Sequence, residues 1–209
     1  MQIGSRGWQH RTWLGSFYPD DLPSDWQLPF YSNEFDTVLI PSSELLNNGH
    51  EQIQEWLDDS HDNFSFFVEF DSRQELSAQF QLALLLQPQL SGLVLNTPVN
   101  QLSLTPKNFS VLATETLGQD IQLYAPDSTE KGNTSSDNTQ LVYDIRSKTE
   151  QNRRFLGLLR SNTLSTKALK DLLGVLHKTD GGCEALFFAG SKPEIEMLRQ
   201  AATIYELSY

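Results

Sequence analysis

Short apolar runs bounded by turn residues alternate along the chain with stretches whose apolar residues recur every three or four positions. The runs have the length and composition of buried strands, and their alternation with helical patterns is typical of a parallel α/β fold. The pattern predicts strands at 2–5, 37–40, 64–70, 92–95, 121–124, 140–144, 154–159 and 185–189. Eight strands close a TIM-type (β/α)₈ barrel, and a chain of 209 residues is at the small end for such barrels.

Helices are predicted between these strands at 28–35, 51–57, 76–84, 166–176 and 193–205. In the second of them, Ile53, Trp56 and Leu57 have the i, i+3, i+4 spacing of a buried stripe. Thr166 can cap the fourth helix, and Pro193 stands where the fifth would begin.

The interval 126–138 breaks this pattern. It reads Pro-Asp-Ser-Thr-Glu-Lys-Gly-Asn-Thr-Ser-Ser-Asp-Asn, which has no apolar period and is typical of a polar flexible loop. A regular barrel would carry its fifth helix here, and the later link 146–153 is also short and polar. We therefore predict one domain over 1–209, an α/β TIM-type barrel that is small and thinned, with helix five missing or reduced.

Charge and composition narrow the classes of partner. A formal net charge of −12 repels polyanions, so no nucleic-acid binding is predicted. No stretch approaches the apolar length of a membrane span, and the N-terminus has no leader pattern. Cys183 is the single cysteine, which excludes an internal disulfide and favours the cytoplasm. The four histidines have no paired spacing, so neither a metal nor another cofactor is predicted.

The opening of the chain is the strongest candidate for a site. A first strand breaks at Gly7 and runs into a loop that mixes aromatic and basic side chains, as many sugar, base and carboxylate pockets do. The candidates in this stretch are Arg6, Trp8, His10, Trp13 and Tyr18. The alternative is that the aromatic side chains only fill the mouth of the barrel; it is favoured for Trp13 and Phe17 and is evenly balanced for Trp8 and His10.

This opening resembles the YecE-like family, also known as domain of unknown function 72. The family begins Ile-Gly-Thr-Ser-Gly-Trp and continues with Trp-x-Gly-x-Phe-Tyr-Pro and x-Leu-Pro, to which 3–8, 13–19 and 22–23 are similar. The resemblance continues to Val38, and beyond that residue it extends to the order of the strands alone. It implies a TIM-type barrel and no established activity.

Several polar positions of the family are replaced in this chain. On the fifth strand, a Glu, an Arg and a His of the family look like Gln122, Tyr124 and Ala125. A Lys that ends the third strand looks like Glu69, and a Gln on the fourth looks like Asn96. The family's Asp on the sixth strand and Arg on the seventh look like Asp144 and Arg160. Barrels of this type carry their chemistry at the carboxyl ends of the strands, so these four residues join the candidate ligand-binding set.

Catalytic residues stay unknown at this point. Glu69 and Asp144 form the one pair of carboxylates that the pattern places at strand ends near the barrel axis, with His10 as a possible third group. A neighbouring Arg6 or Arg160 would neutralise either carboxylate. No Gly-x-Ser-x-Gly elbow exists, and Cys183 lies at the start of its strand, which is the wrong end for a nucleophile.

Two hypotheses for function follow. The Glu, Arg and His that are replaced on the fifth strand would act as a unit, so their loss favours a catalytically degenerate protein that serves as a binding or structural module. Its partner would be a small polar ligand or another protein. The alternative is an enzyme or binding protein for a small polar or anionic ligand at the carboxyl mouth of the barrel.

Overall fold

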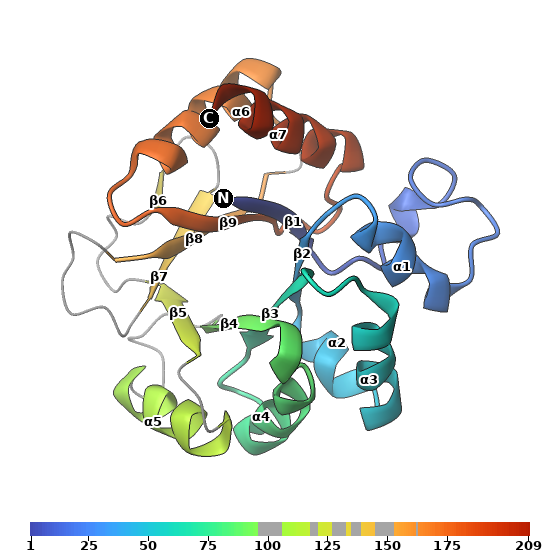
Figure 1. Ribbon diagram of the computed structural model, residues 1–209. Coiled ribbons are helices and arrows are strands. Elements are labelled where there is room, and N and C mark those ends of the chain that lie inside the picture. The colour runs from blue at the N-terminus through green and yellow to red at the C-terminus, as the bar shows by residue number, and fades with distance from the viewer. Residues whose placement is uncertain (96–105, 118–120, 127–132, 135–138, 145–152, 162) are drawn as a thin grey trace.

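The strands form a closed barrel. The computed structural model describes residues 1–95, 106–117, 121–126, 133–134, 139–144, 153–161 and 163–209. Eight strands pair in the closed order β1-β2-β3-β4-β5-β7-β8-β9, and the two-residue strand β6 adds to β7 (Figure 1). All eight predicted strands are confirmed to within two residues at each end. They are β1 Gln2–Arg6, β2 Thr37–Ile40, β3 Ser65–Phe70, β4 Leu90–Leu95, β5 Gln122–Pro126, β7 Thr139–Asp144, β8 Phe155–Leu159 and β9 Cys183–Phe188, with β6 at Asn133–Thr134.

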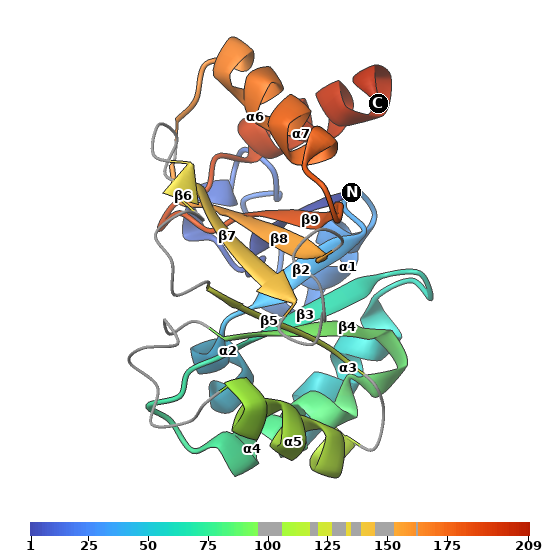
Figure 2. The same ribbon diagram turned by 90° about the vertical axis from the view of Figure 1, so that its left-hand side faces the viewer.

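The TIM-type barrel is confirmed, but the prediction that all its strands run parallel is wrong for β7. This strand pairs antiparallel with both neighbours, as the registers Tyr124↔Asp144 and Thr139↔Leu159 show, and Figure 2 shows it in the part of the barrel wall that faces the viewer. Parallel neighbours require a long crossover, whereas antiparallel neighbours can be joined at one edge of the sheet. Neither of the links that flank β7 has the sequence of a crossover helix, so the strand reverses direction.

The predicted loop at 126–138 lies mostly outside the described residues. In its described part, Pro126 ends β5, and Asn133–Thr134 form β6, which pairs antiparallel with β7. Between β5 and β7 the structure describes only Asn133–Thr134, so the missing or reduced helix five stays a prediction. The predicted short link 146–153 is also outside the described residues, except Arg153.

Seven α-helices among the described residues lie outside the ring of strands (Figure 1). All five predicted helices are present, as α1, α3, α4, α6 and α7. The predicted 51–57 is the centre of α3, which is longer. Two helices, α2 and α5, were not predicted. The bounds of the seven helices are α1 Gln27–Ser32, α2 Ser42–Asn47, α3 His50–Asp59, α4 Leu76–Leu85, α5 Pro106–Leu117, α6 Thr166–Lys178 and α7 Ile195–Ser208, and the short 3₁₀ turns are η1 Arg11–Trp13, η2 Ser24–Trp26 and η3 Gln87–Gln89.

Apolar side chains fill both faces of the barrel wall. A larger cluster lies between the strands and the helices and includes the stripe Leu169, Leu172, Leu173 and Leu176 of α6. A smaller cluster fills the barrel interior, where Leu39, Phe67, Val94, Tyr124 and Phe187 are at most 2% exposed. The interior is therefore packed, and polar chemistry is restricted to its ends.

The opening loop is part of the outer core. Gly7 adopts φ +75°, which turns the chain out of β1, and its amide still donates to the Leu39 carbonyl at 2.8 Å. Trp8 then meets Trp56 of α3 edge to face at 5.0 Å. The Trp13 indole donates to the Pro193 carbonyl at 2.7 Å, which ties the loop to the segment before α7. These contacts connect the start of the chain to its end.

We expect Trp8→Ala to lower the free energy of unfolding by about 3–5 kcal/mol, because it leaves a large cavity in a packed core. Trp26→Ala is the matched control, since Trp8 is 1% exposed and Trp26 is 65% exposed. The control should change stability by less than about 0.5 kcal/mol. Urea unfolding followed by circular dichroism measures both. Equal effects would contradict the assignment of Trp8 to the core.

Candidate functional site

Two arginines lie on one row of residues at the carboxyl mouth of the barrel. Ser5 of β1 pairs with Phe188 of β9, and Phe188 pairs with Leu159 of β8. The next residues along these strands are Arg6, Ala189 and Arg160, so the two arginines are two strand spacings apart, or about 10 Å between Cα atoms.

The same row faces the barrel axis. Ser5 points outward, where its hydroxyl donates to the Tyr31 hydroxyl at 3.1 Å, and Phe188 and Leu159 belong to the outer core. Successive side chains of a strand alternate between its faces, so Arg6, Ala189 and Arg160 face inward. Ala189 packs against the interior cluster, as this assignment requires. Ala189, whose side chain is small, stands between the two arginines in this row.

Arg6 is bound to a carboxylate across the mouth. Its Nε lies 3.0 Å and its Nη2 2.5 Å from Oε2 of Glu69. The Glu69 side chain is 3% exposed and that of Arg6 is 34% exposed. A buried carboxylate needs such a partner, because burial of an unpaired charge is costly. The carboxylate near the carboxyl end of β3 is therefore neutralised by the arginine that ends β1.

Arg160 has a neutral partner. Its Nη2 donates to Oε1 of Gln140 at 2.9 Å, and the side chain is exposed. Gln140 comes from the first half of the reversed strand β7, where it pairs in register with Leu158. An amide oxygen orients the guanidinium without cancelling its charge. Arg160 therefore keeps a net positive charge at the mouth.

The aromatic candidates are in the core and do not face the mouth. Trp8, Trp13 and Tyr18 are each 1% exposed. The Tyr18 hydroxyl donates to the Trp8 carbonyl at 2.8 Å, and burial raises the pKa of this phenol above its usual range. These side chains pack, as the alternative predicted, but they do so in the outer core and not in the mouth of the barrel.

His10 lies at the edge of the same loop. Its Nε2 is 3.2 Å from the Gly7 carbonyl, and its ring is 4.4 Å from that of Trp13. Burial is the main cause that lowers the pKa of His10 below 6.5, and the charge of Arg6 adds to it. The imidazole is therefore neutral at pH 7 and adds no charge to the mouth.

The remaining two candidates do not join this group. Asn96 lies outside the described residues. Asp144 ends the reversed strand β7, and its amide donates to the carbonyl of Arg154, the residue before β8, at 2.9 Å. Asp144 is thus beside the amino end of β8, whereas Glu69 is near the carboxyl end of β3. The predicted pairing of Glu69 and Asp144 at one end of the barrel is therefore wrong, because it assumed a parallel β7.

Glu44, which follows the second strand, was not among the predicted site residues. It lies in the first turn of α2, and its buried Oε1 has no hydrogen-bond partner among the described residues. A Cβ atom on Gly7 would lie 3.2 Å from its Oε2. Burial raises the pKa of Glu44 to about 7, although the charge of Arg6 acts in the opposite direction. The sequence signal, an acidic residue in a first helical turn, is typical of an exposed position.

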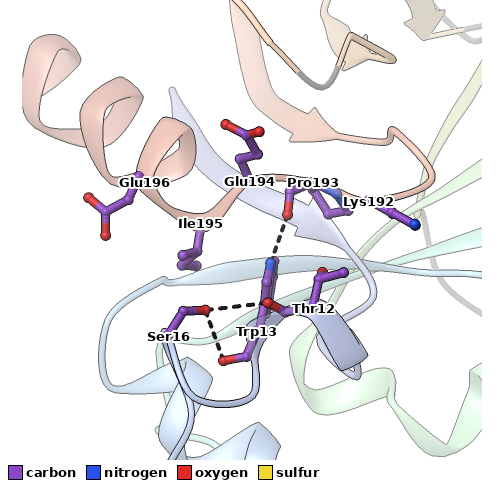
Figure 3. A pocket seen from close by; sticks show the side chains of 8 residues that line it. All are labelled: Thr12, Trp13, Ser16, Lys192, Pro193, Glu194, Ile195 and Glu196. Carbon is purple, nitrogen blue, oxygen red and sulfur yellow. Dashed lines mark hydrogen bonds between the residues drawn. The ribbon is translucent and has the colours of Figure 1, made fainter.

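A hollow of about 360 Å³ adjoins the opening loop (Figure 3). Trp13, Pro193 and Ile195 give it an apolar lining, and Thr12 and Ser16 lie on the side of the loop. The charged ends of Lys192, Glu194 and Glu196 point in different directions in Figure 3. The polar groups do not converge, so the hollow offers no evident chemistry.

Other reactive groups are not placed for catalysis. Cys183 begins β9, and burial raises the pKa of its thiol to about 12, so it is no thiolate at pH 7. Within the described part of the chain, no three His, Cys, Asp or Glu side chains are grouped to hold a metal ion. No helix in that part is long and apolar enough to span a membrane.

Fold and site together define a TIM-type barrel with a polar mouth. The sequence model of a family described as "Protein of unknown function DUF72" matches residues 2–83. A DUF72 family protein from Enterococcus faecalis has a similar crystal structure, with a TM-score of 0.62 and 14% identity over 100% of this chain and 96% of that one. For a DUF72 family protein from Thermotoga maritima, the TM-score is 0.59 and the identity 13%, over 97% of this chain and 98% of that one.

These findings confirm the predicted resemblance. Residues 2–83 match the DUF72 family, which is the YecE-like family, and the similar solved structures share the barrel. A search of curated proteins found no match. The comparisons show a family match over the first part of the chain and a shared fold, and they assign no reaction.

We expect Arg6→Ala to destabilise the protein by about 3–5 kcal/mol, because it leaves the Glu69 carboxylate buried without its partner. The double variant Arg6→Ala/Glu69→Gln should recover a large part of this loss, and urea unfolding of the four proteins in the cycle measures the coupling. Strictly additive effects would show that the ion pair is not formed in solution.

Glu44 should make stability depend on pH between its unfolded and folded pKa values. The folded pKa of about 7 is above the ordinary 4.5, so the folded state binds the proton more tightly. The contribution of Glu44 is complete below pH 4.5 and is lost as the pH rises to about 7. We expect Glu44→Gln to remove this decline and to be more stable than the parent at pH 8, by up to about 3 kcal/mol.

The control for this prediction is Glu51→Gln. Glu51 lies in the first turn of α3 and is exposed, so the substitution makes the same change in charge. Thermal unfolding from pH 4 to pH 8 is the measurement. A Glu44→Gln profile parallel to that of the parent protein would contradict the buried environment of Glu44.

Proposed function

We propose that this protein is a non-catalytic binding module that holds a small anionic ligand at the carboxyl mouth of its barrel, between Arg6 and Arg160. The observation that carries the proposal is their shared row, in which both arginines face the axis on either side of the small Ala189. A carboxylate or phosphate group placed above Ala189 could accept hydrogen bonds from both sides.

The chemistry of guanidinium supports this class of ligand. Its planar fork of N–H donors matches the oxygens of carboxylate and phosphate, and such charge-assisted bonds are stronger than neutral ones. Arg160 is already oriented by Gln140, which lowers the entropic cost of binding. Arg6 shares its charge with Glu69, so Arg160 supplies most of the attraction.

Overall charge limits the size of the ligand. The net charge of −12 acts against polyanions at long range. A small molecule with one or two anionic groups is repelled less than a nucleic acid. The same proposal places the protein in the cytoplasm, where small carboxylates and phosphates are abundant.

The composition of β5 supports the non-catalytic part of the proposal. The family's Glu and Arg look like Gln122 and Tyr124 here, and Tyr124 is fully buried in the interior cluster. Its hydroxyl donates to a Glu184 carboxylate oxygen. This position therefore contributes packing where the family has a charged group.

A second candidate function is acid/base catalysis at the same mouth. Glu44 favours it, because a carboxyl group with a pKa near 7 can donate or accept a proton at neutral pH. Glu69, which is bound to Arg6, would then be the second carboxyl group of the pair. Conversion of a bound ligand over time would favour this candidate over the binding module.

The test is a thermal-shift screen against carboxylic acids, phosphorylated metabolites, sugars and nucleotides. A ligand that binds the folded state raises the melting temperature. We expect hits among small anions, loss of the shift in Arg160→Ala and partial retention in Arg160→Lys, because the Lys side chain keeps the charge but loses the fork.

The control is Lys178→Ala, which removes one exposed positive charge from the far end of α6. It should leave the shift unchanged. Equal loss in Lys178→Ala and Arg160→Ala would show that only the net charge matters. The absence of hits among small anions would contradict the proposal and favour a protein partner.

A further inference from the structure

A second hollow lies outside the barrel wall, on the flank where α1 and α3 are side by side (Figure 1). Its volume of about 230 Å³ is smaller than that of cavities that take drug-sized ligands, so it suits a smaller molecule. The lining comes from the opening loop, η2, α1, α3 and Asn48, which follows α2. Every side chain in the lining except Leu28 carries a polar group. The arginines of the barrel mouth, Arg6 and Arg160, do not line it.

Two tryptophans of this lining have indole N–H groups without an acceptor. Trp8 and Trp56 are 1% and 4% exposed, and neither N–H donates a hydrogen bond within the described part of the chain. In that part, the fully enclosed side-chain polar atoms without a partner are Glu44 Oε1 and Thr139 Oγ1, so neither indole nitrogen is fully enclosed. Each N–H therefore opens on the hollow that both rings line. The equally buried Trp13 differs, because its indole donates to a carbonyl at 2.7 Å.

The two indole N–H groups are fixed in place but lack a partner. The Trp8 carbonyl accepts a hydrogen bond from the Tyr18 hydroxyl at 2.8 Å, and the rings of Trp8 and Trp56 meet edge to face at 5.0 Å. Buried indole N–H groups usually have a hydrogen-bond partner, because an unmatched buried donor costs free energy. Two fixed donors at one hollow therefore point to an occupant that supplies hydrogen-bond acceptors.

Carboxylate and amide oxygens line the same space. Asp25 and Asp59 form no ion pair with a Lys, Arg or His among the described residues. The side-chain amides of Asn48 and Gln52 donate elsewhere in the protein, at 2.7 and 2.8 Å, and their oxygens are left as acceptors. The amide of Gln9 has no partner in the described part of the chain and offers both a donor and an acceptor. The hollow therefore presents donors and acceptors together.

We propose that this hollow binds a small neutral polyol, such as a single sugar ring, whose hydroxyl groups contact the indoles of Trp8 and Trp56 and the carboxylate of Asp59. A hydroxyl group both donates and accepts, so a polyol can match the two kinds of group in the lining at once. An organic cation would match the carboxylates alone and leave the indole N–H groups without acceptors. An anion would match the indoles alone, and Asp25 and Asp59 would repel it.

The experiment is titration of the full, nitrogen-15-labelled chain with myo-inositol and with D-glucose, followed through the indole N–H resonances of the four tryptophans. We expect at least one of these polyols to give saturable shifts for Trp8 and Trp56, whose N–H groups gain acceptors, and none for Trp13, whose N–H is already bonded. Cyclohexanol is the matched probe, since it has the carbon ring of myo-inositol with a single hydroxyl group. Equal shifts with cyclohexanol would overturn the assignment of a polyol site.

Trp56→Phe keeps an aromatic ring and removes the N–H, so it should weaken binding roughly fivefold, which is the contribution of one hydrogen bond. Its control, Trp26→Phe, makes the same change at a 65% exposed residue outside the hollow and should bind as the parent does. Asp59→Ala and its exposed control Asp62→Ala test the acceptor side in the same way.

Equal effects within either pair of variants would overturn the site. The absence of shifts with both polyols would show that the hollow holds water alone, and it would overturn the proposal as well.

Discussion

The antiparallel pairing that brings β7 between β5 and β8 decides which side chains meet at each end of the barrel. Closure of a barrel requires that every strand has two hydrogen-bonded neighbours. The polar links on both sides of β7 supply no described helix for a crossover, and the strand meets this requirement by reversing. The start of β7 therefore lies beside the carboxyl end of β8, and its last residue lies at the opposite end.

This reversal exchanges a carboxylate for an amide at the mouth. A parallel β7 would end in Asp144 at the mouth, where that carboxylate could neutralise Arg160. In the observed register, Gln140 takes the place beside Arg160, and Asp144 lies next to Arg154. One change in strand direction thus leaves a guanidinium with a neutral partner at the mouth. The proposed anion site is a consequence of the topology as much as of the residue types.

The opening loop has a different role from the one that its composition first indicated. Its aromatic side chains form a continuous network, in which Trp13 lies 5.5 Å from Phe17 and stacks at 6.1 Å on Tyr31. Tyr31 in turn donates to the Thr37 carbonyl at 3.0 Å. The stretch that most resembles the DUF72 family therefore specifies packing around β1 and β2. Of its five candidate residues, Arg6 reaches the mouth.

The sequence predicted the strands well because most of them are apolar runs buried on both sides, and such runs are readable from the residue types alone. It did not give the direction of β7, because an apolar period is the same in either direction. Helix α5 was missed although Phe109, Ala113 and Leu117 recur every four residues and are buried. The environment of Glu44 was not predictable, because its burial results from the close approach of Gly7, a contact between separate segments.

The most direct test of this account is a crystal structure of the protein with a small carboxylate or phosphate that binds in solution. If the proposed anion site is correct, we expect electron density for the anion above Ala189, within hydrogen-bond distance of the guanidinium groups of both Arg6 and Arg160. Density for the ligand at another place, with Arg160 still bound to Gln140 and the space above Ala189 unoccupied by the ligand, would contradict it.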